Sequence, residues 1–135
     1  MSLPQEPLAK QIPLSFATCS IRCRETDTLP KKLEAISSAG FTAIELAFPD
    51  LQQFACEFLN REIHPYNYID LCTAAVEVTE ECEKRNLKIL MLQPFANFEG
   101  WPGGSKERDD AFERARGWIE IMAVCGTDML QVKTT

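Results

Sequence analysis

Short apolar runs alternate along the chain with longer segments whose apolar residues recur at helical spacing. The apolar runs predict strands over residues 14–21, 43–48, 88–92 and 129–133. The segments between them predict a helix from about residue 29, a short one after residue 50, a long one over 67–85 and another over 106–125. Strands separated by helices are typical of a parallel sheet built by right-handed crossovers.

Capping residues set the expected helix boundaries. Asp27 or Thr28 can cap the first helix, which has Pro30 in its first turn and Gly40 after its end. Asp50 can cap the short second helix. The helix faces expected to point at the sheet comprise Leu29, Leu33 and Ile36; Leu51, Phe54, Ala55, Phe58 and Leu59; Ile69, Cys72, Val76 and Cys82; and Phe112, Ala115, Ile119 and Met122.

The order of elements favours a (β/α) barrel over a nucleotide-binding α/β fold. No glycine-rich phosphate-binding loop follows the first predicted strand. A complete barrel typically needs ~250 residues, and this chain has 135. We therefore expect about half a barrel, four parallel strands with intervening helices, over residues 13–135, preceded by a short flexible lead over residues 1–12.

Composition excludes several functional classes. The net charge of −6, without a basic stripe, argues against a nucleic-acid partner. No apolar stretch approaches the ~20 residues of a membrane span, and the start lacks the basic and apolar segments of a signal peptide. We therefore expect no membrane association and a cytoplasmic location. The six cysteines have irregular spacing and no CxxC pair, so we expect them to be reduced and not to bind zinc.

Strand alternation singles out Glu45. Ile44, Leu46 and Phe48 share one face of the second predicted strand and are expected to pack under the helices, so Glu45 points into the barrel. A carboxylate in that position needs an ionic partner, a metal or a ligand. A structural ion pair with Lys133 or Arg22 is the alternative to a binding role.

Other polar and aromatic residues are expected at the carboxyl ends of the strands, where barrel enzymes bind substrate. Arg22 follows the first strand, Gln93 ends the third, and Lys133 shares the inward face of the fourth. Phe95 and Trp101 would form the wall. The alternatives are an exposed Arg22, a Gln93 that bonds only its own loop, a frayed Lys133 and an aromatic pair in the core. No catalytic residue and no metal ligand is assigned; the expected substrate-binding residues are Arg22, Glu45, Gln93, Phe95, Trp101 and Lys133.

Two motifs carry a family resemblance. One is Gly40-Phe41 followed by Ile44-Glu45-Leu46, and the other is the segment LQPFANFEG over residues 92–100. With SIRC near the start and WIEIMAVCGTDMLQV at the end, the chain from about Pro13 resembles the N-terminal half of fungal 3-dehydroshikimate dehydratases. More broadly, it is similar to the xylose isomerase-like TIM barrels of sugar isomerases and epimerases.

The resemblance implies an isomerase, epimerase or dehydratase acting on a small polyhydroxylated carbonyl compound. It also implies Mg²⁺ or Mn²⁺ in the full-length protein, where the metal stabilises an enolate. The family's metal ligands lie in the second half of the barrel, so we expect no cofactor in this chain and an incomplete catalytic site. Phe48-Pro49-Asp50 replaces the histidine-acidic pair of the dehydratases, which favours an isomerase-like protein of unknown substrate.

The same resemblance leaves two expectations for partners. The small-molecule substrate would bind only when the barrel is completed, either by a second copy in a homo-oligomer or by a missing C-terminal half. The alternative is a non-catalytic half-barrel that serves as an oligomerisation or interaction module.

Overall fold

The computed structural model describes residues 12–21, 24 and 26–134, which form one sheet with its covering helices. The sheet has the order β1-β2-β3-β4, and each pair of neighbouring strands is parallel. The strands are β1 (Ser15–Ala17), β2 (Ala43–Ala47), β3 (Lys88–Phe95) and β4 (Leu130–Val132). The helices are η1 (Thr18–Ser20), α2 (Leu29–Ser38), α3 (Phe48–Leu59), α4 (Tyr68–Glu83) and α5 (Lys106–Cys125). This order confirms the predicted half-barrel architecture.

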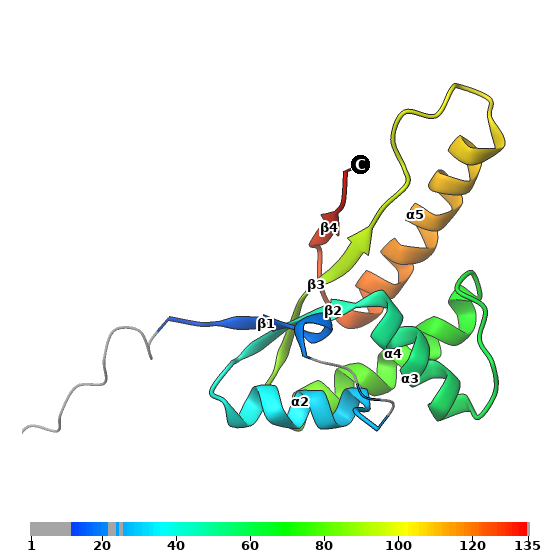
Figure 1. Cartoon of the computed structure of the whole chain (residues 1–135). Helices are drawn as coiled ribbons and strands as arrows, with labels where there is room; N and C mark the ends of the chain where they lie inside the picture. Colours follow the sequence, from blue (N-terminus) through cyan, green and yellow to red (C-terminus); the bar gives the residue numbers. More distant parts are fainter. Residues whose placement is uncertain (1–11, 22–23, 25, 135) are drawn as a thin grey trace, which may run out of the picture.

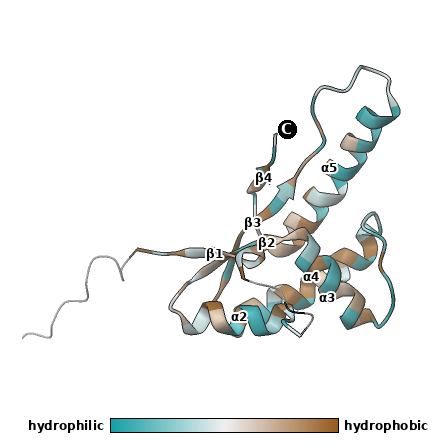
Figure 2. Cartoon of the chain, in the orientation of Figure 1, coloured by the Kyte–Doolittle hydropathy of each residue, from teal (hydrophilic) through white to brown (hydrophobic). Residues whose placement is uncertain are grey.

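Helices α2 to α5 lie on one side of the sheet, and none of the described α-helices lies on the other side (Figure 1). Right-handed crossovers between parallel strands place successive helices on the same side in this way. The core fills the space between the two layers, and each helix shows hydrophobic and hydrophilic bands (Figure 2). Its fully buried members include Leu33, Ile44, Leu46, Leu51, Leu71, Leu92 and Ile121. None of the helices in the described ranges is both long and apolar enough to cross a membrane.

The predicted inward stripe of α4 is wrong in part. Ile69 is 82% exposed and Val76 is 49% exposed, whereas Cys82 is buried as expected. The buried face is formed instead by Leu71, Ala74, Ala75, Val78 and Cys82. Helix α4 packs between α3 and α5, and its buried face combines the small Ala74 and Ala75 with the larger Leu71 and Val78.

The stripe predicted for α5 is also displaced. Phe112 and Ile119 are 53% and 57% exposed, while Met122 is buried. The residues that pack into the core are Ala111, Gly117, Trp118, Ile121, Met122 and Cys125. Helix α5 is therefore apolar on two faces, and the sequence pattern alone cannot tell which of them meets the sheet.

Helix α3 begins earlier than predicted. Phe48 is its first residue rather than the end of β2, and Pro49 lies in its first turn, where proline is favoured. Asp50 is consequently inside the helix and does not cap it. Its carboxylate accepts a hydrogen bond from the buried ammonium of Lys32 at 2.9 Å, and Lys32 also donates to the Thr18 carbonyl at 3.3 Å.

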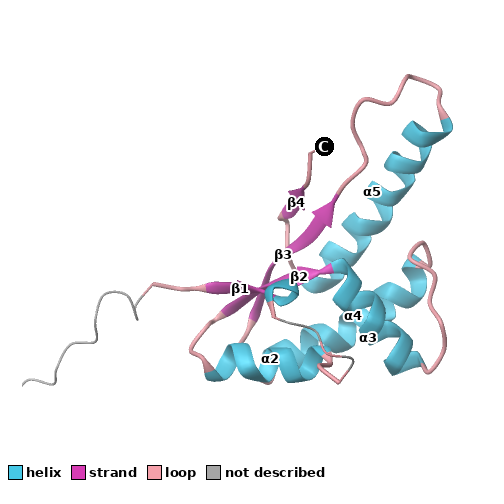
Figure 3. Ribbon diagram, in the orientation of Figure 1, coloured by secondary structure: helices cyan, strands magenta, loops and turns pink. Residues whose placement is uncertain are grey.

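Strand β3 is longer than predicted. It continues from Leu92 through a cis peptide bond between Gln93 and Pro94 and ends at Phe95. By contrast, β1 ends at Ala17, where a 3₁₀ turn begins. A long loop then joins β3 to α5, seen in pink at the top of Figure 3.

Candidate functional site

Glu45 and Gln93 lie on the face of the sheet opposite helices α2 to α5. The neighbours of Glu45 along β2, Ile44 and Leu46, are fully buried on the helix side, which confirms the predicted alternation. Gln93 is in register with Ala47, two residues after Glu45, so Gln93 and Glu45 share a face. In a closed barrel this face lines the interior. Glu45 is half-buried there.

The turn η1 folds over the carboxyl end of this face. Thr18 is fully buried, and its hydroxyl accepts a hydrogen bond from the Ala47 amide at 3.0 Å. The side-chain amide of Gln93 lies 3.5 Å from the Cys19 sulfur, a weak contact, and Gln93 itself is only 7% exposed. Gln93 thus keeps most of its donor and acceptor capacity while being held at the strand end.

The structure separates the other predicted residues. Phe95 is 4% exposed and packs edge-on against Trp118 in the core, at 5.2 Å between ring centroids. Lys133 is exposed just after β4, and its backbone amide donates to the Phe95 carbonyl at 2.7 Å. Trp101 lies in the loop after β3, and Arg22 lies outside the described residues. Only Glu45 and Gln93 are therefore shown to share one surface.

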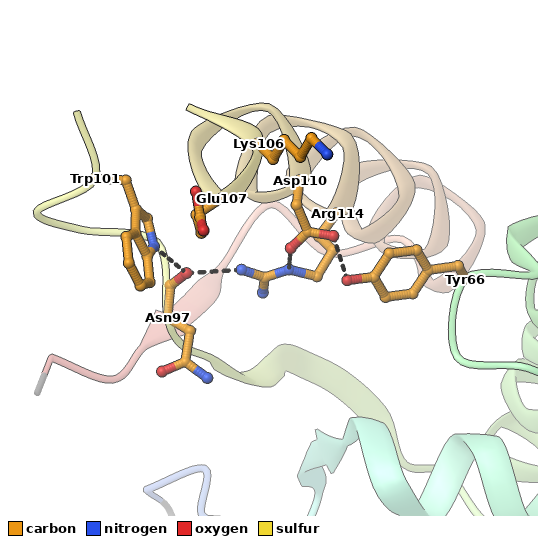
Figure 4. A pocket seen from close by; sticks show the side chains of 7 residues that line it. All are labelled: Tyr66, Asn97, Trp101, Lys106, Glu107, Asp110 and Arg114. Carbon is orange, nitrogen blue, oxygen red and sulfur yellow. Dashed lines mark hydrogen bonds and ion pairs between the residues drawn. The ribbon is translucent and has the colours of Figure 1, made fainter. Parts of the chain in front are cut away.

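Trp101 belongs to a second site, a pocket of about 480 Å³ between α5 and two loops (Figure 4). Tyr66 reaches it from the loop before α4, and Asn97 and Trp101 reach it from the loop after β3. The first half of α5 forms the rest of its wall, with Lys106, Glu107, Asp110 and Arg114.

Arg114 ties this pocket together. Its guanidinium donates to Asp110 at 2.8 Å and to the carbonyls of Ala96 and Asn97 at 2.9 and 2.8 Å. The Tyr66 hydroxyl donates to the other Asp110 oxygen at 2.5 Å. The network therefore fixes the loop after β3 and the loop before α4 to the same helix.

These contacts also set the ionisation of the pocket. The hydrogen bond from Tyr66, followed by the one from Arg114, holds the pKa of Asp110 below its usual value. The bond to Asp110, helped by burial, raises the pKa of Tyr66. At neutral pH the carboxylate is ionised and the phenol is protonated. With Asn97 and Glu107 at the wall, the pocket offers both donors and acceptors to a small polar molecule.

Sequence reasoning missed this network for a simple reason. The spacing of Asp110 and Arg114 is that of a helical ion pair and can be recognised in the sequence. Tyr66 is 44 residues from Asp110, and no local pattern connects them.

The part of the chain that the structure describes contains no group of three or more His, Cys, Asp or Glu side chains able to hold a metal. Burial raises the pKa of Cys82 and of Cys125 to about 12, so both remain thiols at neutral pH and are poor metal ligands. The residues described here do not fit a metal centre, and no chemical step is assigned to one.

Comparison with known proteins agrees with this architecture. A 3-dehydroshikimate dehydratase of Neurospora crassa is 29% identical over 122 residues, which cover 88% of this chain and 34% of that protein. A 3-dehydroshikimate dehydratase of Pseudomonas aeruginosa is 33% identical over 118 residues, covering 87% of this chain and 15% of that protein. The chain thus spans about a third and about a seventh of these two relatives.

The solved structures point to the same fold. A xylose isomerase-like TIM barrel/4-hydroxyphenylpyruvate dioxygenase fusion protein superimposes with a TM-score of 0.64 at 28% identity, covering 90% of this chain and 16% of the fusion protein. The sequence profile described as "Xylose isomerase-like TIM barrel" matches residues 33–134. The chain therefore belongs to the xylose isomerase-like TIM barrel family.

Proposed function

We propose that this chain forms the N-terminal part of the substrate-binding face of a barrel that dehydrates 3-dehydroshikimate or a closely similar cyclic polyhydroxylated ketone. Relatives that carry this activity in their names support the proposal. The observation that carries it is the placement of Glu45 and Gln93 together on the uncovered face of the sheet, toward the strand ends. Substrates bind at these ends in barrels of this kind.

The two side chains offer complementary chemistry to such a substrate. The Glu45 carboxylate accepts hydrogen bonds from ring hydroxyls, and the Gln93 amide donates to a carbonyl or hydroxyl oxygen. Arg22, which follows the first predicted strand in the sequence, would pair with the substrate carboxylate. The divalent metal that the resemblance implies would be bound by residues beyond those described, so its chemistry is not attributed to this chain.

Binding is tested without requiring turnover. Two-dimensional NMR of the chain titrated with 3-dehydroshikimate should show shifts at Glu45 and Gln93. Glu45→Gln and Gln93→Leu should each weaken binding by about tenfold, the loss expected for a hydrogen bond to a charged or well-ordered group. Glu80→Gln, at an exposed position on α4, is the matched control. Unchanged affinity in both site variants would reject the assignment.

Activity is tested by grafting. The region of the Neurospora crassa relative that aligns with this chain is replaced by it, and formation of the aromatic product is followed by absorbance. A chimera that folds and dehydrates 3-dehydroshikimate supports the proposal. The second candidate, a non-catalytic interaction module, is favoured by the uncovered apolar side of α5. A folded but inactive chimera, together with a chain that binds no substrate, would favour that alternative.

A further inference from the structure

The pocket between α5 and its two loops combines aromatic rings with many polar groups. Figure 4 shows Trp101 at one end and Tyr66 at the other, with the charged side chains of α5 between them. Each of its lining residues is aromatic or carries a polar side chain. Most small-molecule sites are largely apolar with a few polar groups. A pocket this polar therefore suits a ligand with many hydrogen-bonding groups.

The pocket lies on the side of α5 that faces α4. Gly117 marks this side, because an added Cβ there would meet the Tyr68 ring. Asp110 precedes Gly117 by about two helical turns, so both lie on the same side of the helix. The lining residues all come from positions 66–114, and none of those described belongs to β4. The pocket is therefore formed between neighbouring elements within the chain.

The aromatic wall at Trp101 is held in one orientation. Its indole N–H donates to the Asn97 carbonyl at 3.1 Å, and the Arg114 guanidinium donates to the same oxygen at 2.8 Å. Trp101 nevertheless remains 43% exposed. The face of an indole carries partial negative charge, which attracts the weakly positive C–H groups of another ring. Trp101 thus offers a fixed surface on which a saturated ring can stack.

The charges of the pocket cancel. Arg114 and Asp110 form an ion pair at 2.8 Å. Lys106 and Glu107 are exposed, and neither makes a hydrogen bond or ion pair with any residue that the structure describes. An ion attracted by one of these two free groups is repelled by the other, whereas a neutral ligand can bond to both. The lining therefore favours a ligand without net charge.

We propose that this pocket binds an uncharged polyhydroxylated ring, a monosaccharide or a cyclitol. The C–H face of the ring lies against Trp101, while its hydroxyls donate to Glu107 and accept from Lys106. A hydroxyl both donates and accepts hydrogen bonds, so it suits a wall that carries both kinds of partner. The volume of about 480 Å³ lies within the ~300–1,000 Å³ range of small-molecule sites. This inference does not depend on which compound the barrel face binds.

The experiment is two-dimensional NMR of the whole chain titrated to tens of millimolar with methyl α-D-glucopyranoside and, separately, with myo-inositol. The two tryptophans supply a reporter and an internal reference. The indole N–H signal of Trp101 should shift and saturate with at least one probe. That of Trp118, which is 7% exposed and stacked on Phe48, should stay in place. A Trp101 signal that neither probe moves would overturn the proposal.

Variants of the two free charged groups test the hydrogen bonds. Glu107→Gln and Lys106→Met should each weaken binding of the probe by about threefold to tenfold, with the Trp101 indole as the readout. Glu120→Gln, an exposed position of the same helix that does not line the pocket, is the matched control and should leave the affinity unchanged. Unchanged affinity in both pocket variants would reject these contacts and with them the proposal.

Two further arms test the location and the ligand class. Gln93→Leu alters the barrel face and should leave the Trp101 shift intact, because Gln93 does not line the pocket. Loss of the shift in that variant would place the probe on the barrel face and overturn the proposal. Gluconate, an anion, and choline, a cation, should bind more weakly than the neutral probe. Tighter binding of either ion would overturn the assignment to an uncharged ring.

Discussion

Gly117 lies against the Tyr68 ring, and this contact predicts whether Gly117→Ala raises or lowers the stability of the fold. An alanine Cβ at position 117 would lie 2.4 Å from three carbons of the Tyr68 ring. Ordinary carbon contacts are ~3.5–4.0 Å, so the overlap exceeds about 1 Å and the ring has to move. Without that ring, Gly117→Ala in the interior of α5 would stabilise the helix by about 1 kcal/mol.

The two effects oppose each other, and the clash should be the larger. Overpacking a well-filled site costs about 1–3 kcal/mol, and three simultaneous overlaps place this site toward the upper end. After the helix-propensity gain is subtracted, Gly117→Ala should lower the free energy of unfolding by about 1–2 kcal/mol. For a chain of this size, each kcal/mol corresponds to a shift of about 3 °C in Tm.

The assay is urea unfolding followed by circular dichroism, with and without Tyr68→Ala. In the Tyr68→Ala background the ring is absent, so Gly117→Ala should stabilise by up to about 1 kcal/mol. The coupling between the two sites would then be about 2–3 kcal/mol, a value found for residues in direct contact. Protein concentration is kept equal in all samples because association adds to the measured stability. If Gly117→Ala stabilised both backgrounds equally, α4 and α5 could not pack with Gly117 against Tyr68.

Three further predictions concern charge and metal. Both Tyr66 and Tyr68 should ionise above the usual pKa of ~10. The hydrogen bond to Asp110 raises the pKa of Tyr66, and burial raises the pKa of Tyr68 to about 12. Asp110→Asn should therefore lower the midpoint of Tyr66 ionisation in an absorbance titration. Because the folded pKa of Tyr66 is raised, its contribution to stability is complete below pH ~10 and is lost as pH rises through the folded value. The pKa of Asp110 is lowered, so its contribution to the free energy of unfolding is present above pH ~3.9 and is lost as pH falls through its folded pKa. Ionisation of both tyrosines at the usual pKa would contradict the hydrogen-bond network. Asp50→Ala should cost about 3–5 kcal/mol because it removes the carboxylate that pairs with the buried Lys32 ammonium, and adding Lys32→Met should recover much of that loss in urea unfolding. Equal stability of the single and double variants would show that the pair is not coupled. Calorimetric titration with Mn²⁺ should detect no tight site on the chain, because the described residues bring no three ligating side chains together, and one micromolar site per chain would contradict this.

Elements with a strong local signal could be predicted from the sequence. β2 carries alternating bulky and polar residues, so Ile44 and Leu46 were correctly placed under the helices and Glu45 on the opposite face. The number of strands and their parallel pairing followed from the alternation of apolar runs with helical segments. These features depend on periodicity along a single segment, which the sequence contains in full.

The candidate site was only partly predictable. Gln93 lies near the carboxyl end of β3, two residues before its last residue, and shares a face with Glu45 as the strand alternation predicts. Phe95, expected in the pocket wall, lies in the core because β3 continues to Phe95, whose ring packs against Trp118. The extension of the strand by three residues, from Leu92 to Phe95, moves a side chain between environments, and no sequence pattern specified that extension.

By itself, therefore, the sequence determined the order of the elements, the parallel sheet and the residues that alternate along β2. Only the tertiary structure decided which of two apolar faces of α5 meets the sheet, since Trp118 and Ile119 are adjacent in the chain but lie in the core and on the surface, respectively. It also brought Tyr66 to Asp110 and Lys32 to Asp50. The physical reason is that periodicity fixes faces relative to a single axis, whereas burial and ion pairing depend on which neighbouring element each face meets.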